Sequence, residues 1–265
     1  MNKWFLLEES KPGKGSYNMA VDDFLFESLG KETVTFIRFY TWKRPTVSIG
    51  CSQDIREVLD LEFCRKNRIE IVRRITGGKL VLHHKEVTYS VCSSDVSVFP
   101  PSLSRSYKKI SESLIAGLKK VDIPAYLASD DNLSYSRSSL PCFSYPAQNE
   151  IKVNNRKIVG SAQKRTAHKF IQHGSIPLEN DDQLLQSVSL LDQRNEEIRM
   201  ITASQAAHRK IDFVLLVRNL ISGIQEFFNV ELQDMKLSRE QKQAIRNIQK
   251  KRHENTDWIY YKKKH

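Results

Sequence analysis

The sequence predicts a mixed α/β core followed by a helical C-terminal extension. Runs of β-branched and aromatic residues over 33–52, and apolar residues at a period near two over 70–94, are typical of strands. Helical spacing of apolar residues over 16–29 and 104–120 alternates with these runs. From about residue 181 only helical patterns follow. We therefore expect a core over 1–180 and a mainly helical extension over 181–265.

The elements of the first half follow from local pattern. A helix is expected over 16–29, with Ser16 as its candidate cap, because apolar side chains there form one face. Strands are expected over 33–42 and 44–52, on either side of a Lys-Arg-Pro break, and a helix over 55–66.

The second half carries one further strand region before the helices. After a polar stretch without clear periodicity over 127–140, residues 149–165 have apolar positions interrupted by the turn-forming pair Asn154-Asn155, which predicts a hairpin. KFIQHGSIPL adds a strand. Helical patterns then cover DDQLLQSVSLL, IDFVLLVRNLISGIQEFF and SREQKQAIRNIQKKR.

Composition bounds the class of protein and its partners. The chain is 40% apolar and 28% charged, as folded proteins are, and 42 Lys and Arg against 31 Asp and Glu give a net charge of +11. This excess favours an anionic partner. The basic residues are spread along the chain without an aromatic RNA-binding signature, so we do not expect nucleic acid as that partner.

Neither export nor membrane insertion is expected. The first residues lack a long apolar run with a cleavage site, and runs such as FVLLV are too short to span a bilayer. The four cysteines are widely spaced and form no CxxC pair, so we expect free thiols rather than disulfides or a zinc site. A cytoplasmic protein is the expectation.

The stretch RRITGGKLVLHH, residues 73–84, is the densest group of polar and glycine residues. A Walker-type phosphate loop needs Gly where Arg73 stands and Ser or Thr where Leu80 stands. A metal site is not expected, because the adjacent His83 and His84 project to opposite faces of a strand. Two interpretations remain open on pattern alone: a hairpin turn with solvated basic residues, or a pocket in which glycines let a ligand approach the main chain.

Several motifs together resemble the lipoate–protein ligase and octanoyltransferase superfamily, relatives of biotin–protein ligase. They are Arg74-x-x-Gly77-Gly78 with His83, then Thr88-Tyr89-Ser90, and then RKIVGSA from residue 156. The similarity begins at Asn18-Met19-Ala20 and extends to HGSIPL, and the helical remainder resembles the family's accessory domain. The resemblance implies a mixed, largely antiparallel sheet flanked by helices, with residues 1–180 as an acyltransferase catalytic core.

The resemblance also implies an acyl-binding tunnel. It assigns the acyl-binding residues Arg74, Gly77, Gly78, His83, Gly160, Ser161 and Ala162. Lys157 would hold the acyl carbonyl. His84 departs from the family, in which an acidic residue is usual at that position.

A cysteine indicates which reaction of the family applies. The order of CF from Cys142, NEI from Asn149 and the lysine motif resembles the cysteine-dependent octanoyltransferases, whereas ATP-dependent ligases typically lack that cysteine. Lys79 after the glycine pair agrees, because many ligases carry a third glycine there.

A thiol needs a nearby positive charge to act as a nucleophile at neutral pH. Its ordinary pKa near 8.5 leaves only a few per cent thiolate, and an ammonium within about 4–6 Å lowers such a pKa by about one to three units. Cys142 and Lys157 are therefore the predicted catalytic pair, with Lys157 also stabilising the oxyanion.

The predicted reaction moves octanoyl from octanoyl-acyl carrier protein to a lysine of a lipoyl-accepting protein, such as glycine cleavage H protein or a 2-oxoacid dehydrogenase E2. It passes through a Cys142 thioester and needs no cofactor or metal. One alternative is an ATP-dependent lipoate–protein ligase, which would use ATP and Mg. Others are an amidotransferase that moves octanoyl between lipoyl proteins, and a noncatalytic basic binding protein.

Overall fold

We describe the fold from a computed structural model that covers residues 3–30, 32–128, 149–190 and 200–261. The helices are α1 (Gly15–Ser28), α2 (Ile55–Val58), α3 (Leu61–Lys66), α4 (Leu103–Lys119), α5 (Asp182–Val188), α6 (Ala203–Ala206), α7 (Phe213–Phe228), α8 (Arg239–Ile248), the π-helical turn η2 (Gln249–His253) and α9 (Thr256–Tyr261). The strands are β1 (Lys3–Gly13), β2 (Val34–Trp42), β3 (Thr46–Ile49), β4 (Glu70–Arg73), β5 (Val81–His83), β6 (Glu86–Ser93), β7 (Tyr126–Leu127), β8 (Ile151–Val153), β9 (Arg156–Arg165), β10 (Phe170–Pro177) and β11 (Gln233–Asp234).

The described strands form a large and a small sheet. The large sheet has the order β11-β1-β2-β6-β10-β9-β8-β7, and all its pairings are antiparallel except those of β1 with β2 and β11. The small sheet has the order β4-β3-β5. The predicted mixed, largely antiparallel sheet is confirmed.

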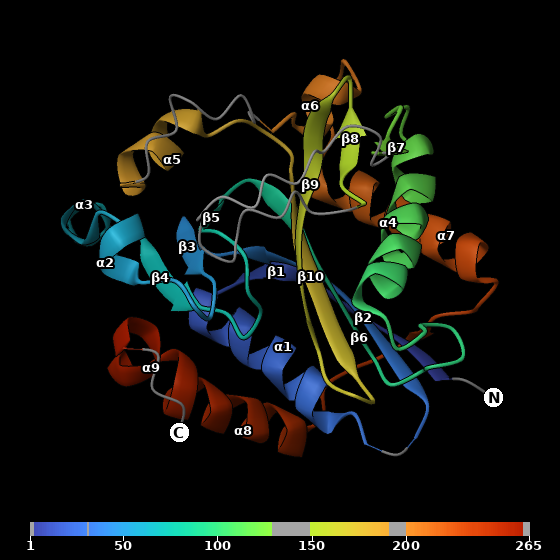
Figure 1. Cartoon of the computed structure of the whole chain (residues 1–265), viewed down its shortest axis with the longest axis horizontal. Helices are drawn as coiled ribbons and strands as arrows, with labels where there is room; N and C mark the ends of the chain where they lie inside the picture. The colour runs from blue at the N-terminus through green and yellow to red at the C-terminus, as the bar shows by residue number, and fades with distance from the viewer. Residues whose placement is uncertain (1–2, 31, 129–148, 191–199, 262–265) are drawn as a thin grey trace, which may run out of the picture.

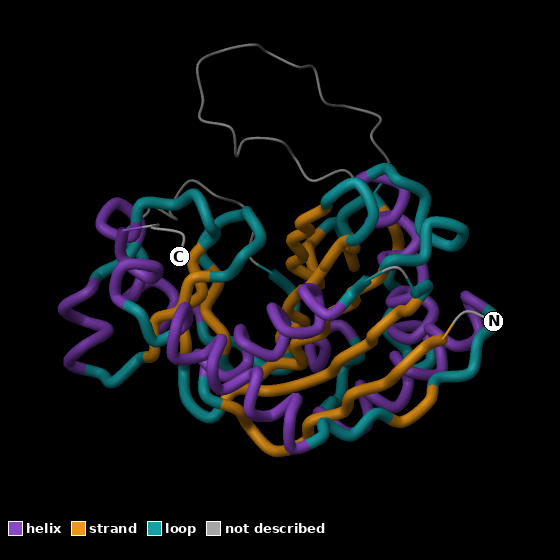
Figure 2. The backbone as a smooth tube through the Cα atoms, turned by 90° about the horizontal axis from the view of Figure 1, so that it is seen from below, coloured by secondary structure: helices purple, strands orange, loops and turns teal. Residues whose placement is uncertain are grey.

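Helices cover both faces of the large sheet. On β2, Ile37 and Phe39 point into a core shared with α4 and α7, whereas Phe36 points into a second core shared with α1 and α8. This alternation follows from the two-residue period of a strand. Figure 1 shows α4 and α7 on one side of the long strands and α1 with α8 on the other, and Figure 2 shows helices crossing in front of the strands from below.

The glycine stretch is not a simple hairpin. β4 and β5, on either side of it, do not pair with each other, because β3 lies between them and pairs with both. The hairpin interpretation of residues 70–83 is therefore wrong. The predicted hairpin at Asn154-Asn155 is confirmed, with β8 and β9 antiparallel and φ of 49° and 61° at the two asparagines.

Two helix predictions need correction. Ser16 does not cap α1, whose N-cap position is Lys14; the Ser16 hydroxyl instead accepts a bond from Gln249 Nε2 at 3.0 Å. The single helix expected over 55–66 is two helices, each capped by its own aspartate, Asp54 and Asp60. Leu59 between them is extended and forms a β-bridge with Ser189.

The described C-terminal elements pack directly on the core. Helix α7 lies so close to α4 that a Cβ added at Gly223 would be 2.2 Å from the backbone nitrogen of Gly117. β11 extends the large sheet beside β1, and α8 packs on α1. The division at residue 180 stays a prediction, and helices do predominate beyond it.

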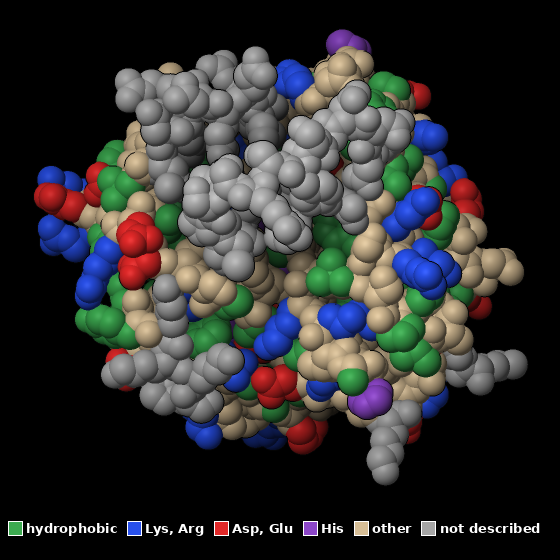
Figure 3. All heavy atoms as spheres, viewed as in Figure 1, with side chains coloured by type: hydrophobic (Ala, Val, Ile, Leu, Met, Phe, Trp, Pro, Cys, Tyr) green, Lys and Arg blue, Asp and Glu red, His purple; other side chains and the backbone are tan. Residues whose placement is uncertain are grey.

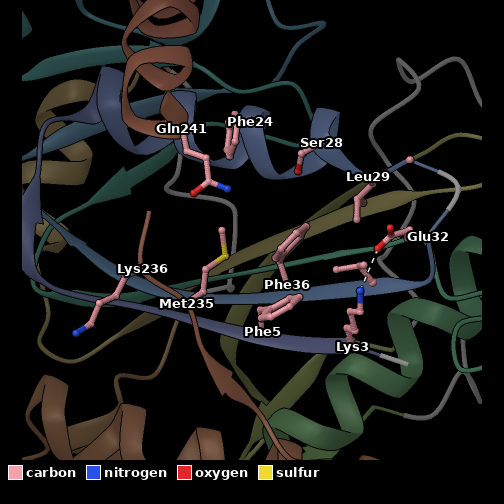
Figure 4. Close-up of a pocket in the computed structure, with 12 residues that line it drawn as sticks. Lys3, Phe5, Phe24, Ser28, Leu29, Glu32, Phe36, Met235, Lys236 and Gln241 are labelled. Atoms are coloured by element: carbon pink, nitrogen blue, oxygen red, sulfur yellow. Dashed lines mark hydrogen bonds and ion pairs between the residues drawn. The ribbon is translucent and has the colours of Figure 1, made fainter. Parts of the chain in front are cut away.

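A cavity of about 590 Å³ lies between strands β1 and β2 and helices α1 and α8. In Figure 4, Phe5 and Phe36 lie side by side at one side of the cavity, and Lys3 pairs with Glu32 at its rim. Strands β6 and β10 separate this cavity from β9. It is therefore separated from Lys157, which lies on β9.

The distribution of surface charge and the length of the apolar helices are two further features of the described residues. On the face drawn in Figure 3, Lys and Arg side chains are interspersed with Asp and Glu rather than gathered into one patch. Within the ranges described, helices that combine enough length with enough apolar character to cross a bilayer do not occur.

Candidate active site

The loop of residues 74–80, which we call the glycine loop, is fixed by the buried Arg74. Its guanidinium donates to the carbonyl of Ser48 at 2.9 Å, to that of Gly77 at 2.8 Å and to that of Lys79 at 2.6 Å. Burial lowers the pKa of Arg74 to about 10. The side chain therefore shapes the loop from inside, and it donates to these carbonyls and to the Ser48 hydroxyl.

The glycines of this loop allow a close backbone approach. Gly78 has φ of +92°, a conformation that favours glycine. A Cβ added at Gly50, at the end of β3, would lie 2.2 Å from the carbonyl oxygen of Gly78. A Cβ at Gly78 itself would approach the Cβ of Ala162 on β9 to 3.7 Å. The loop thus lies between the small sheet and β9, which favours the pocket interpretation over a solvated turn.

A β-bulge in β9 orients Lys157. Ile151 pairs with Val159, but the next residue of β8, Lys152, pairs with Lys157, so Ile158 is the extra residue. Because side chains alternate along a strand, five residues would normally place Lys157 and Ala162 on opposite faces. One extra residue reverses this, and bulges commonly re-aim side chains beside active sites.

The bulge therefore places Lys157 on the face of β9 that carries Gly160 and Ala162. This face meets the glycine loop, since Ala162 lies against Gly78. Met200 covers the same face, with its Cε 3.9 Å from the position of a Cβ at Gly160. The result is an amine at one end of a strip of small and apolar groups, which suits an acyl chain that ends in a polar carbonyl.

Lys157 forms an ion pair with Glu150. Its Nζ donates to Glu150 Oε1 at 2.7 Å, and each side chain keeps about a fifth of its surface exposed, 21% and 20%. Glu150 immediately precedes β8, so the hairpin itself brings the pair together. The ammonium is thereby held in place and remains accessible.

A buried polar network connects α1 to the glycine loop. Asp22 accepts from Arg38 Nη1 at 2.7 Å and from His173 Nδ1 at 3.0 Å. Because the carboxylate accepts this bond, the other ring nitrogen of a neutral His173 is free to accept from Thr76 Oγ1, 2.6 Å away. Burial opposes the ionisation of Asp22, but Arg38 and His173 outweigh it and lower the pKa of that carboxyl.

A second network supports the loop from β6. His83 Nδ1 lies 2.7 Å from Glu86 Oε1, and its Nε2 lies 2.7 Å from Ser48 Oγ, which also accepts from Arg74 at 3.0 Å. The His83 ring stacks on Trp42 with centroids 4.1 Å apart. Burial opposes the ionisation of Glu86, but His83 outweighs it and lowers the pKa of that carboxyl.

The structure brings together part of the predicted acyl-binding set. Gly77, Gly78 and Ala162 meet at the loop, with Gly160 on the same face of β9. Ser161 lies on the opposite face, where its hydroxyl is 2.7 Å from the Tyr89 hydroxyl. His83 and Arg74 are buried supports of the loop. Cys142 lies outside the described residues.

The remaining sequence features have separate partners. His84, the departure from the family pattern, contacts Asp181. Among the described residues, no group of three or more His, Cys, Asp and Glu side chains could hold a metal ion. Cys51, Cys64 and Cys92 are free thiols, as predicted. Burial raises the pKa of Cys64 to about 11, which makes it a poor nucleophile.

Sequence reasoning missed Glu150, Thr76, His173 and Asp22 as parts of the site. His173 opens the HGS motif of β10 and Glu150 lies within the NEI motif, so both stood in segments that carried the resemblance. A buried histidine facing a carboxylate 151 positions away has no local signal. Only the packing of α1 against β10 brings that pair together.

The chain is similar in sequence to known proteins over nearly its full length. A family model described as the lipoyl protein ligase A/B catalytic domain matches residues 14–215. The chain is 35% identical to octanoyltransferase LipM of Clostridioides difficile, with 95% of this chain and 96% of that protein covered. It is 30% identical to octanoyltransferase LipM of Bacillus subtilis, over 92% of this chain and 94% of that one.

Solved structures share the fold. A putative lipoate protein ligase of Thermoplasma acidophilum with bound lipoic acid superimposes with a TM-score of 0.80 at 20% identity, over 98% of both chains. A lipoate-protein ligase A bound with ATP gives a TM-score of 0.81 at 21% identity, also over 98% of both chains.

Proposed function

The chain belongs to the lipoyl protein ligase A/B catalytic family, and we propose that it is an octanoyltransferase of lipoate biosynthesis. Its donor is octanoyl-acyl carrier protein, and its acceptor is a lysine of a lipoyl-accepting protein such as glycine cleavage H protein or a 2-oxoacid dehydrogenase E2. The octanoyltransferase relatives over nearly the full length support the reaction class.

The observation that carries the proposed mechanism is the position of Lys157. The bulge at Ile158 aims its amine along the face of β9 that carries Gly160 and Ala162 and meets the glycine loop. An octanoyl chain packed on that strip would present its carbonyl to the amine. Arg74, Gly77, Gly78 and His83 would form and support the facing wall, and Ser161 would contribute backbone only.

In the first step, the Cys142 thiolate attacks the thioester carbonyl of the donor. Lys157 donates to the oxyanion that forms, and the carrier-protein thiolate leaves as the new thioester closes. In the second step, the neutral amine of the acceptor lysine attacks that thioester. The amide forms, the amine loses a proton to solvent, and the Cys142 thiolate is regenerated.

No activation by nucleotide enters these steps. A thioester replaces a thioester of similar energy, and the amide that follows lies lower. Neither metal nor cofactor is part of the proposal. We place the enzyme in the cytoplasm, a reducing compartment in which a free Cys142 thiol persists.

The need for ATP tests this proposal against its rival. The chain is incubated with octanoyl-carrier protein and an apo lipoyl domain, after apyrase has removed nucleotide, and the acceptor is analysed by mass spectrometry. We expect full octanoylation without ATP. Octanoylation that requires ATP and Mg would instead identify a ligase, and transfer only from an octanoylated lipoyl protein would identify an amidotransferase. Absence of any transfer would leave a noncatalytic binder.

A further inference from the structure

The C-terminal segment 249–261 reaches the glycine loop through a buried arginine that the proposed mechanism does not use. Arg73 is the last residue of β4, adjacent to Arg74, and is fully buried. Its guanidinium donates to backbone carbonyls, and burial lowers its pKa. A charged group in this position needs each of these acceptors.

The acceptors of Arg73 come from two segments far apart in sequence. Nη1 donates to the carbonyls of Gly50 and Gln53, both at 2.9 Å. Nε donates to the carbonyl of Trp258 at 2.9 Å, and Nη2 to that of Ile259 at 2.8 Å. Trp258 returns a bond, from its Nε1 to the Arg73 carbonyl at 3.0 Å. One guanidinium therefore joins helix α9 to the 50–53 turn.

That turn supports the glycine loop directly. The amide of Cys51 donates to the Thr76 carbonyl at 2.9 Å, and Gly50 lies against the carbonyl of Gly78. A path of hydrogen bonds and close contacts thus runs from Trp258 through the Arg73 side chain and the turn to Gly78, which faces Ala162.

Independent contacts hold α9 in register. Just before it, Arg252 Nη1 donates to Asp23 Oδ2 and to Glu27 Oε1 of α1, at 2.5 and 3.2 Å, and the buried His253 lies 2.9 Å from the same Asp23 oxygen. The segment is therefore fixed to α1 and does not depend on Arg73 alone for its attachment.

We infer that the C-terminal segment is a positioning element of the acyl site, in which Trp258 and Arg73 fix the glycine loop against β9. The expected change in KM for the donor rests on the proposed function, whereas the contacts that join α9 to the glycine loop do not depend on it. Trp258 is not part of the proposed catalytic or acyl-binding set. Replacing it should therefore loosen the glycine loop against β9 without removing a catalytic residue.

Trp258→Phe tests the link, because it keeps a large ring but removes the donor to the Arg73 carbonyl. We expect amide hydrogen exchange in peptides covering 50–53 and 74–80 to speed up about three- to tenfold, the factor for loss of one hydrogen bond. KM for octanoyl-carrier protein should rise by a similar factor while kcat changes less than about twofold. Arg73→Lys should act in the same direction, since an ammonium cannot reach all the carbonyls.

The matched control is Tyr261→Phe, an exposed position of the same helix. It should leave exchange and KM unchanged. If Trp258→Phe exchanges its amide hydrogens at the rate of this control, Trp258 does not hold the glycine loop. If exchange is faster but KM is unchanged, the segment has no role in donor binding. If the unmodified chain transfers no octanoyl group, the proposed function fails, while the exchange comparison still decides the link.

Discussion

Replacing Lys157 with methionine should reduce octanoyl transfer by at least about a hundredfold, the effect of removing one preorganised oxyanion donor. Methionine keeps an unbranched side chain shorter by one atom but removes the amine that the bulge of β9 aims at the glycine loop. The Cys142 thiol would also lose the positive charge that we propose lowers its pKa, so the residual rate should increase with pH up to about 8.5.

Stability should change little in this variant. The partner Glu150 is partly exposed, and such pairs contribute at most about 1 kcal/mol. Lys164→Met is the matched control: Lys164 lies on the same strand, with its ammonium 5.4 Å from the Phe26 ring centre on α1, outside the proposed catalytic set. Initial rates of octanoyl transfer, measured for both variants across pH 6–9, test whether Lys157 takes part in catalysis. A Lys157→Met rate within tenfold of the unmodified enzyme would remove Lys157 from the mechanism.

Replacing Arg38 with methionine should lower the free energy of unfolding by about 3–5 kcal/mol, the usual cost of leaving a buried charge without its partner. Arg38 is fully buried and bonds Asp22 at 2.7 Å and Glu9 Oε2 at 2.7 Å. Its guanidinium also lies 3.7 Å from the centre of the Tyr40 ring. The variant leaves Asp22 charged inside the protein, beside His173.

Urea unfolding measures this effect. Lys3→Met serves as the comparison, because Lys3 and Glu32 form an exposed pair that should contribute at most about 1 kcal/mol. Adding Asp22→Asn to Arg38→Met should recover part of the loss, since it removes the unpaired charge. Equal losses for Arg38→Met and Lys3→Met would contradict the account of the buried network.

Local pattern predicted most of the secondary structure, because helices and strands leave a period in the sequence. Helices α1, α4 and α7 and the hairpin of β8 and β9 occur where apolar spacing and Asn154-Asn155 placed them. The insertion of β3 between β4 and β5 could not be read this way, since strand order depends on pairing between distant segments. Because of that order, the glycine stretch is a loop between the small sheet and β9 and not a hairpin turn.

The candidate site was predictable only in part, for the same reason. Motifs indicated Lys157 and the glycines, but strict alternation would have placed Lys157 away from Ala162, and a bulge leaves no mark in a single sequence. On pattern alone, Arg73 was one of the basic residues that a solvated hairpin turn would expose. Its acceptors lie 185 and 186 positions away, on Trp258 and Ile259.

The octanoyl thioester proposed at Cys142 can be detected by intact-protein mass spectrometry. After brief mixing with octanoyl-carrier protein and an acid quench, without acceptor or nucleotide, we predict that the chain carries one octanoyl group, that hydroxylamine releases it, and that Cys142→Ala abolishes it. Cys51→Ala should keep the adduct. An unmodified chain that transfers octanoyl without ever carrying it, or an adduct that survives Cys142→Ala, would contradict the account.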